Sequence, residues 1–170
     1  CEPMARLGGN VSGIDADENA VLVASEHAKD NGLDITYQTT SSDDLVKSGK
    51  KYDVVLALEI IEHVDNRDTF VKSVMDLCKP DGIVIFSTLN KTGKSFALGI
   101  VAAEYILGWV PKGTHNWKKF VKPSELSRMV SNNGGTPKDL CGLAFNPMKN
   151  EFHLAQKDLD VNYFLSCTKG

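Results

Sequence analysis

The pattern of apolar and polar residues changes period along this chain, as expected where strands and helices follow one another. The clearest stretch is Tyr52–Leu58, a run of β-branched and apolar residues. Such a run is typical of a strand that is buried on both faces of a parallel sheet. The spacing then changes, because Glu59, Glu62 and His63 stand at positions i, i+3 and i+4. A helix beginning there would place all three side chains on one side.

The rest of the chain also alternates between strand and helix patterns. Strands are expected where apolar residues alternate or form short runs, and helices where they recur every three or four positions. The expected strands are Asn10–Asp15, Leu33–Thr39, Gly82–Thr88, Asp139–Phe145 and Asn162–Cys167, and the expected helices are Glu18–Lys29, Asp68–Cys78 and Pro123–Val130, with a turn or short helix at Ser41–Lys47. This alternation predicts an α/β fold with a doubly wound, mostly parallel, Rossmann-like sheet. We expect the last two strands to form a terminal antiparallel pair.

The first residues have the pattern of the second half of a helix. Gly8 and Gly9 follow it, and either is a suitable C-terminal stop. Because a strand comes directly afterwards, we expect the sheet to lack its first strand and the loop that follows it. A missing central strand would leave two strand edges without a partner.

Composition and charge narrow the class of protein. With 42% hydrophobic and 24% charged residues, the chain is balanced like one globular domain over residues 1–170. A net charge of −3 carries no overall basic signal, so no nucleic-acid partner is expected. The four cysteines, Cys1, Cys78, Cys141 and Cys167, lack paired spacing. This argues against a zinc or disulfide framework and suits a reducing compartment.

A segment at about residues 90–121 interrupts the alternation and has the character of a lid or membrane-contact insertion. Its run Phe96–Val110 is apolar apart from Glu104, contains Trp109, and is followed by Trp117. The lysines near it are Lys112, Lys118, Lys119 and Lys122. The run is too short to cross a bilayer, but aromatic residues beside lysines suit an interfacial helix on an anionic membrane. A lid helix over the substrate pocket of a soluble enzyme would have the same composition.

Asp15 ends the first expected strand just before a helix. An acid at this position can accept hydrogen bonds from both hydroxyls of an adenosine ribose. The alternative role is to cap the helix, for which Asp17 is the other candidate. Asp15 alone does not separate a dinucleotide from S-adenosylmethionine. Asp43 and Asp44, after the next strand, are weaker candidates for a contact with adenine.

Glu59, Glu62 and His63 form the strongest candidate cluster. Two carboxylates and an imidazole on one helical face can ligate a divalent cation, with water or substrate oxygens completing the shell. His63 can instead act as a general base tuned by a neighbouring carboxylate. A third possibility is that Glu62 and His63 only orient the loop while Leu58 packs on a cofactor.

Short segments throughout the chain carry a specific resemblance. They are Glu2–Gly8, Gly13–Asp15, Leu58–Val64, Lys79–Gly82, Ser87–Asn90, Ala103–Ile106, Val110–His115, Lys122–Leu126, Phe145–Pro147 and Asp160–Tyr163. Together they resemble the ubiquinone-biosynthesis O-methyltransferases, which are class I S-adenosylmethionine-dependent enzymes. The first half alone would indicate only the methyltransferase superfamily, whereas Pro111–His115 and Asp160–Tyr163 are particular to this family.

The resemblance implies a reaction and a set of site residues. Members of this family methylate ring hydroxyls of polyprenylated catechol-type ubiquinone precursors, of the 3-demethylubiquinol and 2-polyprenyl-6-hydroxyphenol types, at two steps of the pathway. The resemblance implies that Asp15 contacts the ribose of S-adenosylmethionine and that Leu58 lines the cofactor. It also implies that Glu59, Glu62 and His63 hold a magnesium ion.

The resemblance further implies peripheral membrane contact through residues 96–120 and a ubiquinone-biosynthesis complex as a partner. We expect a bacterial cytoplasmic protein that associates peripherally with the membrane. The alternative location is the matrix face of the mitochondrial inner membrane.

The chain departs from the family pattern at its start, since the first strand and its glycine-rich loop should precede Glu2. That loop brings backbone N–H groups to the cofactor. We therefore expect a fragment of a normal enzyme and weak binding of S-adenosylmethionine by these residues alone. Tight binding in a calorimetric titration would contradict this expectation.

Other functions remain open from the sequence. They are another small-molecule class I methyltransferase, an NAD-dependent Rossmann oxidoreductase, in which Asp15 would serve equally well, and a non-catalytic membrane-associated scaffold. Binding of NADH to the full-length protein would favour the oxidoreductase. The sequence upstream of Cys1 would decide about the scaffold, because a glycine-rich loop there would restore the enzyme.

Overall fold

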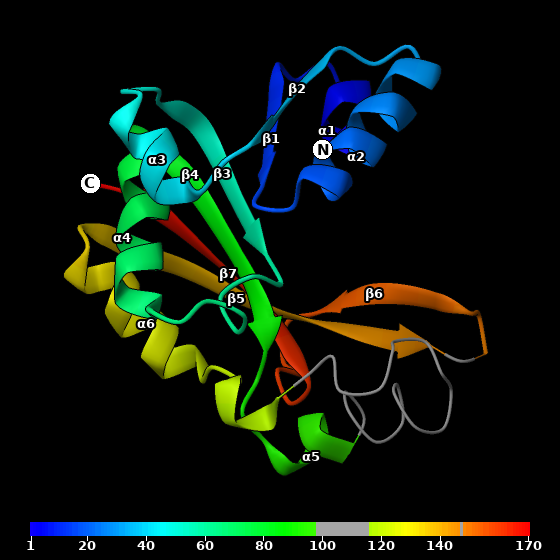
Figure 1. Ribbon diagram of the computed structural model, residues 1–170. Helices are drawn as coiled ribbons and strands as arrows, with labels where there is room; N and C mark the ends of the chain where they lie inside the picture. The colour runs from blue at the N-terminus through cyan, green and yellow to red at the C-terminus, as the bar shows by residue number, and fades with distance from the viewer. Residues whose placement is uncertain (98–115, 147) are drawn as a thin grey trace. The chain divides into compact units, whose positions relative to one another are not determined.

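The computed structural model describes residues 1–97, 116–146 and 148–170 (Figure 1). Packing divides the chain into two compact units, an N-terminal unit, Cys1–Lys50, and a C-terminal unit, Lys51–Gly170. One domain over residues 1–170 therefore stays a prediction.

The N-terminal unit has a two-stranded parallel sheet and three helices. Its elements are α1 (Glu2–Arg6), β1 (Val11–Asp15), α2 (Glu18–Asp30), β2 (Ile35–Thr39) and α3 (Ser42–Lys47). Strands β1 and β2 pair in parallel along their whole length, so that Gly13 lies beside Tyr37. A Cβ atom at Gly13 would lie 2.6 Å from the Tyr37 ring. Glycine at this position therefore leaves room for that ring on the neighbouring strand.

The helix ends of this unit follow the signals in the sequence. Gly8 has a φ of +90°, a left-handed conformation that glycine adopts without strain, and it follows the end of α1 as predicted. The side chain of Asp17 accepts a hydrogen bond from the Asn19 amide and caps α2. Gly32, with a φ of +65°, follows the other end of α2.

The C-terminal unit is built on a five-stranded sheet in the order β3-β4-β7-β5-β6 (Figure 1). Its strands are β3 (Tyr52–Leu58), β4 (Cys78–Leu89), β5 (Gly135–Asn146), β6 (Glu151–Ala155) and β7 (Asn162–Lys169), and its helices are α4 (Arg67–Leu77), α5 (Gly93–Ser95) and α6 (Pro123–Asn132). Strands β3 and β4 pair in parallel, and β7 is antiparallel to both β4 and β5. The predicted terminal antiparallel pair is thus confirmed as β5 and β7. Strand β6 was not predicted.

One face of this sheet forms the core with helices α4 and α6. The residues that meet there are fully or almost fully buried: Val71, Val74 and Met75 from α4, Leu126 and Val130 from α6, and Val84, Phe86, Leu165 and Cys167 from the strands. Apolar residues at spacings of three and four place one stripe of each helix on the sheet. The predicted helices Asp68–Cys78 and Pro123–Val130 are confirmed to within a few residues at each end.

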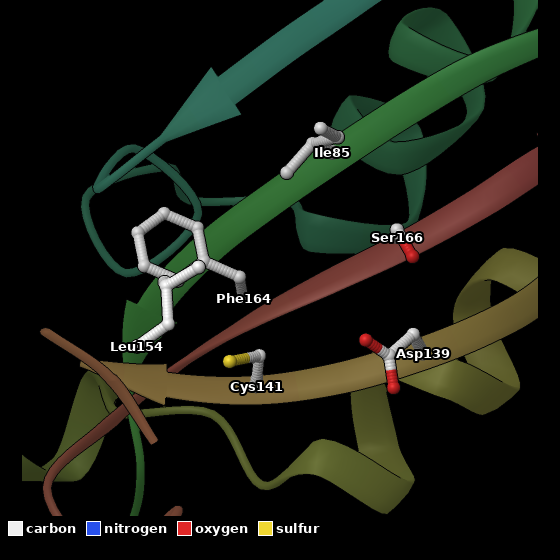
Figure 2. Close-up of a pocket in the computed structure, with 6 residues that line it drawn as sticks. All are labelled: Ile85, Asp139, Cys141, Leu154, Phe164 and Ser166. Carbon is white, nitrogen blue, oxygen red and sulfur yellow. The ribbon is translucent and has the colours of Figure 1, made fainter. Parts of the chain in front are cut away.

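The opposite face of the sheet is apolar but partly exposed. Val54, Leu56 and Leu58 point to this face and retain 42–44% of their accessible surface. Residues of β4, β5, β6 and β7 line an open hollow of about 240 Å³ (Figure 2), and one of them is Ile85, the partner of Leu56 on β4. Its lining residues are Ile85, Asp139, Cys141, Leu154, Phe164 and Ser166. The prediction that Tyr52–Leu58 is buried on both faces is therefore wrong within the described structure, because helices cover only the other face.

The described strands form two separate sheets, in which β1, β2, β3 and β6 each have a neighbour on one side only. That a further strand belongs in the sheet stays a prediction.

The insertion predicted at about residues 90–121 lies largely outside the described residues, since 98–115 are not among them. Its described ends form α5 and a 3₁₀ helix, Trp117–Lys119. Within the described residues, no helix is long and apolar enough to cross a membrane.

Candidate active site

The candidate active site lies where β3 and β4 end side by side. Leu58, the last residue of β3, pairs with Ser87 of β4, and the turn that follows carries Glu59, Glu62 and His63. In parallel α/β sheets, ligands bind at these carboxyl ends of the strands. The predicted cluster thus follows the carboxyl ends of two parallel strands.

The predicted helix beginning at Glu59 is not formed. Glu59 has a φ of +54°, and its N–H donates to the Ser87 carbonyl oxygen at 3.0 Å, which continues the pairing of the sheet by one residue. The His63 N–H then closes a turn onto the Ile60 carbonyl oxygen at 2.8 Å. The next helix, α4, begins only at Arg67. A left-handed residue cannot begin a right-handed helix, so the i, i+3, i+4 spacing does not place the three side chains on one face.

Glu59 is held by the side chain and the backbone of Ser87. The Ser87 hydroxyl donates to Glu59 Oε1 at 2.6 Å, and the Glu59 N–H also approaches Ser87 Oγ at 3.1 Å. The carboxylate of Glu59 is exposed, whereas Ser87 is 3% exposed. The strained backbone of Glu59 is therefore fixed by contacts with the neighbouring strand.

Glu62 is buried, unlike Glu59. It is 3% exposed, and its Oε2 accepts a hydrogen bond from the Thr88 hydroxyl at 2.9 Å. Its other oxygen, Oε1, is buried and has no hydrogen-bond partner among the described residues. A buried acceptor without a donor is costly, which marks this oxygen as a place for a ligand donor or water.

Tyr163 lies opposite Thr88 on β7 and is fully buried. Burial of the hydroxyl, with Glu125 and Glu62 nearby, holds the pKa of Tyr163 far above its usual range. The hydroxyl donates to the Val121 carbonyl oxygen at 3.2 Å. Tyr163 is thus kept protonated and serves as a structural hydrogen-bond donor.

Leu58 and His63 are both exposed at the end of β3. Leu58 retains 42% of its accessible surface on the open face of the sheet. The exposed imidazole of His63 lies on the turn, one residue beyond the buried Glu62. Both side chains are accessible to a ligand.

Asp15 belongs to the N-terminal unit and is exposed at the end of β1. Its Oδ1 accepts a hydrogen bond from the Asp17 amide at 2.9 Å, and Asp17 itself caps α2. The capping role is thus taken by Asp17, which leaves the ribose contact open to Asp15. Asp44 instead pairs with Lys47, whose hydrogen bond holds the pKa of Asp44 below its usual value.

A magnesium site at Glu59, Glu62 and His63, as predicted, requires both suitable ligand atoms and side chains that converge on one point. Carboxylate oxygens suit magnesium, and Glu62 Oε1 lacks a partner. However, within residues 1–97, 116–146 and 148–170, no three His, Cys, Asp or Glu side chains converge as metal ligands. In this arrangement the three residues therefore do not fit a magnesium ion.

The sequence pattern did not indicate that Ser87 and Thr88 contact the candidate site. Both are polar residues at the end of an otherwise apolar strand, Gly82–Thr88, and this was the available signal. Only the pairing of β3 with β4 shows that they reach Glu59 and Glu62.

Solved structures share this fold over nearly the whole chain. A magnesium protoporphyrin IX methyltransferase from Synechocystis PCC 6803 with bound SAH matches with a TM-score of 0.66, at 20% identity, over 99% of this chain and 67% of that one. An S-adenosylmethionine-dependent methyltransferase from Methanosarcina mazei matches with a TM-score of 0.68, at 12% identity, over 99% of this chain and 85% of that one. The fold is therefore the Rossmann-like fold of the class I methyltransferases, as the sequence predicted.

Residues 1–86 match the family described as "Methyltransferase domain", and the chain belongs to this family. Among its relatives, a ubiquinone biosynthesis O-methyltransferase from Dinoroseobacter shibae is 47% identical over 162 residues, which are 95% of this chain. One of the same name from Rickettsia felis is 46% identical over 163 residues, or 96% of this chain. The chain spans 65% and 66% of the lengths of these two relatives.

Proposed function

We propose that this chain is part of an enzyme that transfers a methyl group from S-adenosylmethionine to a ring hydroxyl of polyprenylated catechol-type ubiquinone precursors. The observation that carries the proposal is the turn after β3, which brings Glu59, Glu62 and His63 to the carboxyl ends of two parallel strands. The relatives named ubiquinone biosynthesis O-methyltransferase, at 43–47% identity, support the substrate class.

Asp15 and Leu58 are the proposed cofactor contacts of this chain. The exposed carboxylate of Asp15, whose Oδ1 is oriented by the Asp17 amide, suits the two hydroxyls of a ribose. The exposed side chain of Leu58 offers an apolar surface to the cofactor. Bound S-adenosylmethionine would supply an activated methyl group, so the protein mainly has to orient the acceptor hydroxyl and remove its proton.

His63 is the proposed acceptor of that proton. Its imidazole is exposed on the turn, close in sequence to two fixed carboxylates. A positioned base of this kind typically accelerates such a reaction by about 100-fold or more. Glu59 and Glu62 would orient the acceptor ring through their carboxylate oxygens. No step is assigned to a magnesium ion, because the three side chains do not converge.

The function is tested by incubating the full-length protein with labelled S-adenosylmethionine and a short-chain polyprenyl catechol. We expect label in the methylated ring product and about 100-fold less product with His63→Gln. Lys138→Gln, on the exposed surface of β5, is the matched control and should leave the rate unchanged. A wild-type protein that binds NADH and transfers no methyl group would contradict the proposal.

The magnesium prediction has its own test, which is activity after chelation. If EDTA abolishes methyl transfer by the full-length protein and magnesium restores it, the family assignment of Glu59, Glu62 and His63 is supported. Full activity in EDTA would contradict that assignment and leave His63 as the sole candidate for proton removal.

We also propose peripheral membrane contact near the insertion, in a bacterial cytoplasm. Two aromatic side chains at its described ends are partly exposed, Phe96 at 47% and Trp117 at 36%, and their rings meet edge to face at 6.4 Å. Lys91 Nζ lies 5.5 Å from the centre of the Trp117 ring. Aromatic and cationic groups together suit an anionic membrane surface.

Co-sedimentation with vesicles tests this membrane contact. Binding to vesicles with an anionic lipid, and weaker binding by Trp117→Ala, would support it. Equal sedimentation of both proteins with anionic and neutral vesicles would contradict it. A ubiquinone-biosynthesis complex remains a proposed partner, to be tested by co-purification.

A further inference from the structure

Two neighbouring hydroxyls at the end of β4 hold the two carboxylates of the candidate site. Ser87 Oγ donates to Glu59 Oε1 at 2.6 Å, and Thr88 Oγ1 donates to Glu62 Oε2 at 2.9 Å. Both donors are almost completely buried, at 3% and 0% exposure. Each acceptor lies more than twenty residues away in the sequence, so the contacts are tertiary.

The two hydroxyls act from opposite faces of the strand. Successive residues of a strand point to opposite faces, so Ser87 lies on the open face and Thr88 on the face covered by helices. Ser87 therefore holds the exposed Glu59, and Thr88 holds the buried Glu62. The turn between these two carboxylates is thus fixed at both ends by the end of β4.

Ser87 also supports the left-handed backbone of Glu59. The Glu59 N–H points at both the carbonyl oxygen and the hydroxyl oxygen of Ser87, at 3.0 and 3.1 Å. A non-glycine residue with a φ of +54° persists only when surrounding contacts fix it. Removal of this one hydroxyl would therefore release both the carboxylate and part of the backbone restraint.

Thr88 leaves one oxygen of Glu62 available. Its hydroxyl holds Oε2, while Oε1 is buried without a partner among the described residues. A carboxylate fixed through one oxygen presents the other in a defined direction. The Thr88 hydroxyl thus orients the Glu62 side chain and leaves Oε1 able to accept a hydrogen bond from a ligand.

We propose that Ser87 and Thr88 are positioning residues, which orient Glu59 and Glu62 and thereby the turn that carries His63. The inference rests on the proposed methyl transfer, because it concerns the same turn. Neither hydroxyl is assigned a contact with substrate or cofactor. Their effect on the reaction is expected in turnover, because misplacement by about 1 Å can cost about 100-fold in rate.

The test compares Ser87→Ala and Thr88→Val with Ser87→Thr and Thr88→Ser, which keep a hydroxyl, in the full-length protein. We expect kcat to fall about tenfold to a hundredfold in the first pair, with KM for S-adenosylmethionine within about threefold of the wild type. The second pair should recover most of the rate. Ser131→Ala, which removes a hydroxyl bonded within α6, is the control for loss of a hydroxyl alone.

A double-mutant cycle separates positioning from a general loss of stability. Ser87→Ala combined with Glu59→Ala should lower kcat little more than Glu59→Ala alone, because either change removes the same contact between the Ser87 hydroxyl and the Glu59 carboxylate. Additive losses would contradict the inference, as would equal losses in the hydroxyl-free and hydroxyl-keeping variants. Thermal unfolding identifies any variant that fails to fold. If the variants of Ser87 or of Thr88 do not fold, the variants of the other residue test the inference.

A second readout does not depend on activity. Hydrogen exchange of the peptide containing Glu59–Val64 should be faster in Ser87→Ala and Thr88→Val than in wild type and Ser131→Ala. Unchanged exchange in folded variants would overturn the positioning role. If the wild-type protein transfers no methyl group but the exchange differs as expected, the proposed function fails and the positioning of the turn stands.

Discussion

Glu59 illustrates how a single residue can be in the predicted place but in an unpredicted conformation. It follows β3 as the sequence indicated, yet its φ of +54° ends the strand and prevents a helix from beginning. Ser87 stabilises this conformation through its backbone carbonyl and its hydroxyl. The chemistry of the turn therefore depends on a contact that no local pattern indicates.

Glu59→Gln tests the role of this carboxylate. The amide retains an oxygen that can accept the Ser87 hydroxyl, so the fold and the turn should be kept. We expect kcat for methyl transfer to fall about tenfold or more, because the charge is lost, while the dissociation constant of S-adenosylmethionine changes little. A parallel loss of cofactor affinity, measured by calorimetry, would show that Glu59 acts in binding.

Two buried tyrosine hydroxyls allow a matched comparison of stability. Tyr163 donates to the Val121 carbonyl oxygen, whereas the Tyr52 hydroxyl is buried without a partner among the described residues. Tyr163→Phe should lower the free energy of unfolding by about 1–2 kcal/mol, because a buried carbonyl loses its donor. Tyr52→Phe should be neutral or slightly stabilising. Urea unfolding of both variants measures the difference, and equal losses would contradict it.

At the scale of elements, helices α4 and α6 begin with different N-terminal caps. Helix α4 starts at Arg67, and its N-cap Asn66 accepts a hydrogen bond from the Thr69 amide at 3.0 Å. Helix α6 starts with Pro123, and its N-cap Lys122 makes no side-chain cap. The two helices thus pack on the same sheet face with different kinds of N-terminus.

This difference predicts unequal effects of alanine at the two N-caps. Asn66→Ala should destabilise the protein by about 1 kcal/mol, since an amide of the first turn loses its acceptor. Lys122→Ala should change the free energy of unfolding by less than about 0.5 kcal/mol, because the exposed lysine caps nothing. Chemical unfolding measures both values, and a larger effect at Lys122 would contradict the expectation.

At the scale of the molecule, burial of titratable groups in the C-terminal unit links stability to pH. Cys167 is 1% exposed between the sheet and its helices, and burial raises the pKa of its thiol from 9.0 to about 11. The pKa of Cys78 is raised for the same reason. In the native core these thiols are protonated at pH values where an unfolded chain begins to lose the proton.

The free energy of unfolding should therefore fall as pH rises from about 9 to 11. In this window the folded protein binds more protons than the unfolded chain, so stability decreases with pH, and it is fully present below pH 9. For Cys167 alone, the loss is about 2 kcal/mol. Cys167→Ala should show a shallower slope in urea unfolding at pH 9, 10 and 11. Identical slopes in the two proteins would contradict a titrating thiol.

The sequence by itself determined the elements of this protein. Glycine and aspartate marked the ends of α1 and α2, and Pro123 marked the start of α6, because these signals act within one helical turn. The α/β alternation and the segment matches indicated the methyltransferase fold. Because Glu59 and Glu62 follow the strand Tyr52–Leu58 directly, the sequence also placed them at the carboxyl end of that strand.

Only the tertiary structure decided how the site residues face one another. Ser87 and Thr88 reach Glu59 and Glu62 because β4 pairs with β3, a contact between distant residues that no local period reports. For the same reason the spacing of Glu59, Glu62 and His63 indicated a helix that is not formed. Local periodicity determines which residues share a face of an isolated element. Pairing between strands determines where an element ends and which distant side chains come into contact.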